Sequence, residues 1–260
     1  MSHDLLIKNA TLIDGTGSLP READVAISGN RIAEVGVIDG TAKQVIDAEG
    51  HIVTPGFIDI HTHLDPLLRL PGAESHVRQG VTTALGGPDG SSPWPLADYM
   101  AEAQDLGLGL NVGYTVGHNT VRRAVMGLDD RTPTATELGE MRAMVARGME
   151  DGAWGISTGL KYLPGAFSNV DEVVALSEVA AERGGFYTSH LREEGLRLLE
   201  SVSEAIEIGR RADIPVVLTH HKVVGAPMWG SSTRTLAMVD SARAAGTDVM
   251  IDQYPYTASY

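Results

Sequence analysis

The chain has 260 residues, of which 43% are hydrophobic and 21% charged, proportions that exclude an intrinsically disordered chain or a protein of transmembrane helices. Its formal net charge of −14, without clustered lysine and arginine, argues against a nucleic-acid partner. Since the sequence contains no cysteine, disulfides and thiolate metal ligands are excluded, and any metal ion must be held by nitrogen and oxygen.

Residues 1–53 predict a small β-domain. The N-terminus lacks a basic segment followed by an apolar stretch, and no apolar run is long enough to span a bilayer, so we expect a soluble, cytoplasmic protein without a membrane partner. Short β-type runs at 5–7 and 11–13 lead into a Gly-containing turn. Two further runs, 23–27 and 31–35, are joined by Ser28-Gly29-Asn30, which is typical of a hairpin with glycine at positive φ.

From residue 54 onward, apolar β-type runs alternate with helical stretches, the pattern of βα units around a parallel sheet. The predicted strands are residues 57–61, 81–85, 110–116, 154–157, 186–190, 216–220 and 249–254. The predicted helices are residues 96–106, 136–149, 170–183, 196–212 and 235–244. The helix at 170–183 has Asn169 as N-cap, with Glu172 three residues later as a capping box.

Seven such strands predict an α/β fold of the (β/α)8 TIM-barrel type over residues 54–260, in which functional residues gather at the carboxyl ends of the strands. A barrel needs an eighth strand, and the chain stops at Tyr260 soon after the seventh. We therefore expect a C-terminally truncated barrel, whose closing strand lies in a part of the protein that this sequence does not include.

Four histidines stand at the ends of predicted strands. His61 and His63 end the first strand, and strand periodicity turns both to the same side. His190 and His220 end the fifth and sixth strands, and a barrel brings all four imidazoles to one axial site.

This set predicts a metal site. Neutral imidazole binds zinc and similar ions, and four histidines exceed what one catalytic zinc needs, so we expect one or two divalent metal ions, zinc first among them. A two-metal site normally includes a bridging anion. The candidates are Asp89, which follows the second strand, and Lys161, which follows the fourth and would need a carboxylated amine.

Several segments resemble the amidohydrolase superfamily, and most closely its N-acyl-D-amino-acid deacylase (D-aminoacylase) branch. The resemblance covers nearly the whole chain in the same order and rests on residues 55–63 (PGFIDIHTH), 155–160 (GISTGL), 189–192 (SHLR), 219–222 (THHK) and 254–257 (YPYT). It implies a metal-dependent (β/α)8 barrel that hydrolyses the amide of an N-acylated D-amino acid, a small-molecule substrate, through attack by metal-bound hydroxide.

The resemblance also implies residue roles. His61 and His63 match the first metal pair of the family, and His190 and His220 match the second. That branch usually has a cysteine in a Gly-Asn-Cys-Gly segment after the second strand, where this chain has Gly86-Gly87-Pro88-Asp89-Gly90. Asp89 is the first choice as its replacement and Lys161 the second. The family's catalytic acid/base, an aspartate ending strand eight, is expected beyond Tyr260.

Substrate contacts follow in part from the resemblance. A D-amino-acid substrate carries a free carboxylate, which needs a cation or hydroxyl donors near the metals. Lys222, Tyr162 and Tyr254 are the candidates by resemblance, and Arg192 is a further one that could instead pair with Glu193 or Glu194.

The remaining polar residues near the predicted strand ends have open roles. We interpret His221 as structural or as a support for a metal-bound residue, while His118 could face substrate or cap a loop. Either Asp59 or Asp65 could accept a hydrogen bond from a metal-bound histidine, or stabilise a turn.

Two rival enzymes remain open, a β-aspartyl dipeptidase and a cyclic-amide hydrolase of the dihydroorotase or hydantoinase type. Both use a carboxylated lysine, so the role of Lys161 separates them from a deacylase. A third alternative is an inactive metal-binding fragment. The sequence makes no prediction about oligomeric state.

Overall fold

The computed structural model describes residues 2–64, 66–256 and 258, and its chain divides into two compact units, residues 1–57 and 58–260. The predicted change of pattern was placed at residue 54, and the division falls between Phe57 and Ile58. Among the described residues, no helix combines the length and the apolar character needed to cross a bilayer. Each unit is described by itself.

The first unit is a five-stranded sheet. Its strands are β1 (Ser2–Leu12), β2 (Arg21–Ser28), β3 (Arg31–Gly36), β4 (Thr41–Asp47) and β5 (Ile52–Val53). The order is β3-β2-β1-β4 with β5 beside β1; β1 runs antiparallel to β2 and parallel to β4 and β5. The predicted hairpin is the β2–β3 pair, in which Ser28 faces Arg31 across a turn with Gly29 at φ 61°.

The two runs predicted at 5–7 and 11–13 form one strand. The register of β1 against β2 shifts between Ile7 and Ala10, where Asn9 adopts a φ of 55° and donates its backbone N–H to Asp24 Oδ1. This bulge turns the strand without ending it, because an asparagine tolerates the left-handed region better than most residues. Asn9 therefore marks a bulge within β1 and not a loop between two strands.

The second unit contains the strands of the barrel. They are β6 (Phe57–Asp59), β7 (Val81–Gly86), β8 (Asn111–Tyr114), β9 (Val116–Gly117), β10 (Gly155–Gly159), β11 (Phe186–His190), β12 (Val216–Leu218) and β13 (Val249–Ile251). They form a three-stranded sheet, β6-β7-β8, and a five-stranded sheet, β13-β12-β11-β10-β9. The pairs β7–β8, β9–β10, β10–β11, β11–β12 and β12–β13 are all parallel.

Each predicted strand of this unit is present, with one interruption. The run at 110–116 is divided into β8 and β9 at Thr115, whose hydroxyl donates to the carbonyl of Gly87 at 2.6 Å. The described residues show no pairing of β13 back onto β6 and no further strand between them. The second unit is thus an incomplete (β/α)8 barrel.

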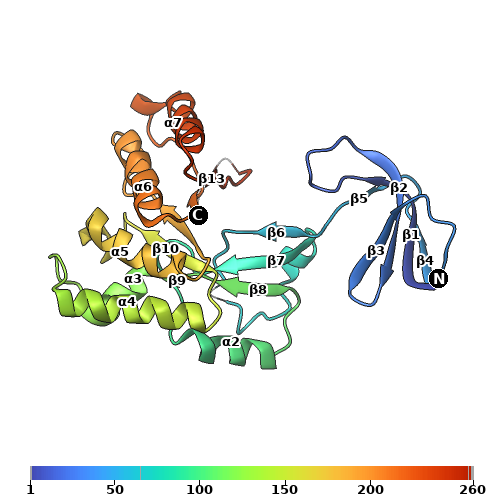
Figure 1. The fold of residues 1–260 in the computed structure, drawn as a ribbon, viewed down its shortest axis with the longest axis horizontal. Coiled ribbons are helices and arrows are strands. Elements are labelled where there is room, and N and C mark those ends of the chain that lie inside the picture. Colours follow the sequence, from blue (N-terminus) through green and yellow to red (C-terminus); the bar gives the residue numbers. More distant parts are fainter. Residues whose placement is uncertain (1, 65, 257, 259–260) are drawn as a thin grey trace. The chain divides into compact units, whose positions relative to one another are not determined.

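The helices follow the strands in chain order. They are α1 (Glu74–Val77), α2 (Leu96–Asp105), α3 (His118–Met126), α4 (Ala135–Glu150), α5 (Val170–Ala181), α6 (Leu198–Ala212) and α7 (Ser232–Ala244), with 3-10 turns at Gly165–Phe167 and Ala226–Met228. In Figure 1, α4, α5 and α6 lie side by side along the five-stranded sheet. Their buried faces and the strands share one apolar core, to which Met141, Ile156, Leu176, Tyr187, Ile208 and Leu218 belong.

The N-terminus of α5 differs from the predicted capping box. Asn169 caps the helix as expected, since its side chain accepts from the backbone N–H of Glu172 at 2.9 Å. The Glu172 side chain does not return to the cap. It is buried against two side chains of α3, with Oε1 at 2.8 Å from His118 Nε2 and Oε2 bonded to the Arg122 guanidinium.

This contact explains why Glu172 leaves the cap. Arg122 and His118 are both fully buried, and a buried guanidinium requires a counter-charge. Burial tends to raise the pKa of Glu172, but His118 and Arg122 outweigh it and hold the pKa below its ordinary value of 4.5. A complete capping box is present at the N-terminus of α4, where the Thr134 and Glu137 side chains each accept from the backbone N–H of the other residue.

We predict that Glu172→Gln lowers the free energy of unfolding of the second unit by about 3 kcal/mol, because it leaves a buried guanidinium without its counter-charge. The measurement is urea unfolding followed by tryptophan fluorescence, since Trp94, Trp154 and Trp229 all belong to this unit.

The matched control is Glu178→Gln on the same helix. Glu178 pairs with Arg142 at 3.1 Å at a partly exposed site, so its loss should cost at most about 1 kcal/mol. Because the pKa of Glu172 is lowered on folding, its contribution is present above pH 4.5 and is lost as the pH falls below that value. Equal losses for the two variants, at all pH values, would contradict this account.

Candidate metal centre

The four predicted histidines and Asp89 lie at the carboxyl ends of neighbouring strands. His61 and His63 follow β6, His190 ends β11, His220 follows β12, and Asp89 lies in the loop after β7. All five line one cavity of about 740 Å³ in the second unit. The structure thus brings together the residues that the sequence predicted as ligands.

A tight turn presents the Asp89 side chain. Asp89 has a φ of 55°, and the Ser157 hydroxyl ties the turn to β10 by donating to the Gly87 carbonyl and accepting from the Gly90 N–H. The backbones are in direct contact here: a Cβ on Gly90 would lie 2.6 Å from the Gly159 nitrogen, and one on Gly159 only 2.1 Å from the Asp89 carbonyl oxygen. Glycine is required at both positions.

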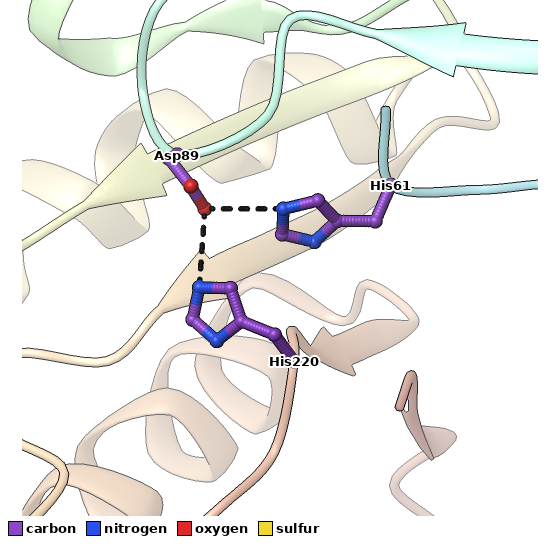
Figure 2. Close-up of side chains that lie close together, drawn as sticks. All are labelled: His61, Asp89 and His220. Carbon is purple, nitrogen blue, oxygen red and sulfur yellow. Dashed lines mark ion pairs between the residues drawn. The ribbon is translucent and has the colours of Figure 1, made fainter. Parts of the chain in front are cut away.

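The Asp89 carboxylate is the centre of the cluster. Its Oδ1 lies 3.7 Å from His61 Nε2 and 3.6 Å from His220 Nε2, and Figure 2 shows the carboxylate between these two rings. Oδ1 also lies 3.6 Å from His190 Nδ1, and Oδ2 lies 3.3 Å from His63 Nε2. One carboxylate therefore faces all four imidazoles.

These donors fit a metal ion. Distances of 3.6 to 3.7 Å are too long for hydrogen bonds, and both Asp89 Oδ1 and His190 Nε2 are buried without a hydrogen-bond partner among the described residues. Two atoms that share a tetrahedral zinc at about 2.0 to 2.1 Å lie about 3.4 Å apart, which is close to the spacing found here. Asp89 Oδ1, which has no hydrogen-bond partner among the described residues, is therefore suited to binding a cation.

Two overlapping donor groups have ligand atoms within 4.8 Å of one another. The first is His61, Asp89 and His220, and the second is His190, Glu194 and His220. His190 Nδ1 and His220 Nε2 approach to 2.7 Å. His220 therefore belongs to both groups.

The charges at this site lower the pKa of the Asp89 carboxyl and raise the pKa of the His61 and His220 rings. Burial tends to raise the pKa of Asp89, but the four histidines hold it far below its usual range. Burial tends to lower the pKa of His61, whereas Asp252 and Asp89 raise it overall to about 9. The pKa of His220 is also raised, because Asp89 and Glu194 outweigh its burial.

Two carboxylates of the site were missed by the sequence analysis. Asp252 comes directly after β13 and places Oδ2 3.3 Å from His61 Nδ1. Glu194 places Oε1 3.2 Å from His220 Nδ1. Asp252 lay inside the strand predicted at 249–254, which in the structure ends at Ile251, and Glu194 was considered only as a partner of Arg192.

Lys222 and the two tyrosines line the same cavity. Lys222 Nζ lies 2.6 Å from Glu194 Oε1 and 2.9 Å from His220 Nδ1, and it donates to the His220 carbonyl. Burial tends to raise the pKa of Glu194, but His220 and Lys222 lower it to about 2. The Tyr162 hydroxyl lies 3.4 Å from His190 Nδ1, and the Tyr254 ring lies 5.8 Å from Lys222 Nζ.

The structure places Arg192 differently from the other substrate-contact candidates. Its guanidinium bonds Glu204 at 2.8 to 3.1 Å and donates to the carbonyls of Ala166 and Ser168, and it pairs with neither Glu193 nor Glu194. These contacts engage its donors within the fold. Lys161 lines the same cavity with an exposed side chain.

The other polar candidates have structural partners. His221 is buried and bonds Thr235 Oγ1 through Nε2 at 2.8 Å, while His118 bonds Glu172. Asp59 Oδ1 accepts from the backbone N–H of His61 at 3.1 Å and thus stabilises the turn after β6. Asp65 lies outside the described residues.

Solved structures of several hydrolases are similar to this chain. An N-acyl-D-glutamate deacylase from Bordetella bronchiseptica, complexed with zinc and a phosphonate inhibitor, is 37% identical with a TM-score of 0.92, and the match covers 98% of this chain and 59% of that one. A D-aminoacylase described as having a binuclear metal center is also 37% identical, with a TM-score of 0.91 over the same shares. An L-hydantoinase from Arthrobacter aurescens, at 19% identity and a TM-score of 0.66, shares the fold.

Curated relatives from Alcaligenes xylosoxydans xylosoxydans give the same picture. A D-aminoacylase is 38% identical over 98% of this chain and 58% of its own length, and an N-acyl-D-glutamate deacylase is 41% identical over 98% and 57%. The chain thus spans less than two thirds of the length of these relatives. The family model described as "Amidohydrolase family" matches residues 44–213. The chain belongs to the amidohydrolase family.

Proposed function

We propose that this chain carries the metal centre of a hydrolase of linear amide bonds, which removes the acyl group from N-acyl-D-amino acids. The observation that carries the proposal is the buried Asp89 carboxylate facing four imidazoles in one cavity. The similarity to D-aminoacylase and to N-acyl-D-glutamate deacylase supports this substrate class. We also propose a cytoplasmic location and the division into a small β-domain and a barrel.

One or two zinc ions would be held by His61 and His63 on one side and by His190 and His220 on the other, with Asp89 shared between the pairs. Asp89 suits this role because its depressed pKa keeps it anionic at neutral pH. When bound, such an ion lowers the pKa of a coordinated water and polarises the carbonyl of the substrate.

The protein side chains supply orientation and hydrogen bonds. Burial, together with the charges of Asp89 and Glu194, raises the pKa of Tyr162, so its hydroxyl keeps its proton and can donate to the acyl oxygen. Lys222 and Tyr254 lie where they can contact the carboxylate of the substrate. Water adds to the acyl carbon, the carbon–nitrogen bond breaks, and a proton passes to the leaving amine, which yields a carboxylate and a free amino acid.

We predict that Asp89→Ala abolishes stoichiometric zinc binding, while Lys161→Ala retains it. Asp89 faces all four histidines, whereas the Lys161 side chain is exposed. Zinc content after gel filtration, measured by atomic emission, separates the two. Loss of zinc in Lys161→Ala with retention in Asp89→Ala would favour a carboxylated lysine and hence a β-aspartyl dipeptidase or a cyclic-amide hydrolase.

We predict that zinc stabilises the second unit. A ligand that binds only the folded state at 100 times its Kd adds about 2.7 kcal/mol to the free energy of unfolding. Thermal unfolding followed by tryptophan fluorescence should therefore shift upward on zinc addition and return on addition of a chelator. A midpoint indifferent to both additions would argue against the proposed centre.

We predict that the product of the complete reading frame, loaded with zinc, releases free amino acid from N-acetyl-D-amino acids and much less from the L-enantiomers. The measurement is amine release across a panel that also contains hydantoins, dihydroorotate and β-aspartyl dipeptides. Turnover restricted to the cyclic amides or the isopeptides would overturn the deacylase proposal.

A further inference from the structure

Asp252 is placed to act on both histidine pairs at once. Its backbone is fixed beside the end of β12, where its N–H donates to the Leu218 carbonyl at 3.2 Å and its carbonyl accepts from His221 N–H at 3.0 Å. Its side chain is 13% exposed and points into the cavity. The position of its carboxylate is therefore determined by the sheet.

The two oxygens of Asp252 have different partners. Oδ2 lies 3.3 Å from Nδ1 of the His61 ring, and Oδ1 accepts a hydrogen bond from the backbone N–H of His220. His220 has a φ of 37°, an unusual conformation for a residue with a side chain, and this bond holds its backbone there. The Asp252 carboxylate thus links the His61 ring, which belongs to the first histidine pair, to the backbone of His220, which belongs to the second.

The bond to His61 Nδ1 decides which ring nitrogen is free. A neutral imidazole carries one N–H, and when Nδ1–H donates to a carboxylate, the lone pair is left on Nε2. Nε2 is the His61 atom that faces Asp89 Oδ1, at 3.7 Å. At His220, Nε2 also faces Asp89, but Nδ1 lies both 3.2 Å from Glu194 Oε1 and 2.9 Å from the Lys222 ammonium, which can only donate.

We propose that Asp252 is a positioning residue that selects the Nε2-ligating tautomer of His61 and, through the His220 backbone, aligns the two halves of the metal centre. The inference rests on the proposed metal centre, but the ring tautomer can be tested without any metal.

The decisive variant is Asp252→Asn, which preserves size while changing one acceptor into a donor. An asparagine cannot accept from both His61 Nδ1–H and the His220 N–H. If its oxygen stays with the His220 backbone, its amide donates to His61 Nδ1 and drives the ring proton to Nε2. Asp59→Asn is the matched control, because Asp59 lines the same cavity and contacts His61 only through its backbone N–H, which an amide oxygen can still accept. Its Oδ2 lies 4.0 Å from His76 Nε2.

Two measurements test the proposal. Zinc affinity, from competition with a chromophoric chelator, should fall about 10- to 100-fold in Asp252→Asn and stay near the parent value in Asp59→Asn. Nitrogen-15 NMR of the metal-free chain, at a pH where the His61 ring is neutral, should show the proton on Nδ1 in the parent and the control, and on Nε2 in Asp252→Asn.

The outcomes separate this inference from the metal-centre proposal. An unchanged His61 tautomer, or a zinc affinity that falls equally in both variants, overturns the role of Asp252. If the parent chain binds no zinc, the proposed centre fails, and the NMR result still decides whether Asp252 sets the tautomer. Circular dichroism of each variant shows that a loss of affinity does not reflect unfolding.

Discussion

A single buried negative charge sets the conditions for this site. The Asp89 carboxylate lies in a cavity where desolvation raises its pKa, and the four imidazoles that face it more than offset this effect and keep it ionised. Those rings come from the ends of β6, β11 and β12, so these strands must end at the same level of the barrel. The parallel sheet meets this requirement, because its strands present their carboxyl ends at one edge.

The features that the sequence predicted well share a local physical signal. His61 and His63 lie on the same side because of strand periodicity, and His190 and His220 follow apolar runs whose β character was evident. The choice of His220 over its neighbour His221 also agrees with the structure, in which His221 bonds Thr235. Helix α5 begins after Asn169 as its cap predicted. Each of these expectations needed only a few adjacent residues.

The features that were missed depend on contacts between distant segments. Asp252 is 191 positions from His61, and the strand predicted at 249–254 included it, so its place at a strand end was not evident. Glu172 was interpreted as a capping-box residue, but its side chain instead bonds the buried Arg122 guanidinium of α3. Helix α3 was not predicted, since its buried Asn119 and Arg122 read as polar positions in isolation. Arg192 likewise finds Glu204, on α6, which no spacing rule indicated.

The glycine-lined turn around Asp89 has a consequence for how this site can diverge. Gly90 and Gly159 are in backbone contact with neighbouring segments, so neither can change without moving two strands apart. The Asp89 side chain itself lies on the cavity side of this turn, facing the imidazoles, so its ligand atom can change while the backbone stays fixed. A single substitution there would exchange a hard oxygen ligand for a softer one and alter the preferred metal without refolding the barrel. The metal preference of this centre can therefore change through a substitution at position 89 alone, while the surrounding turn keeps its backbone.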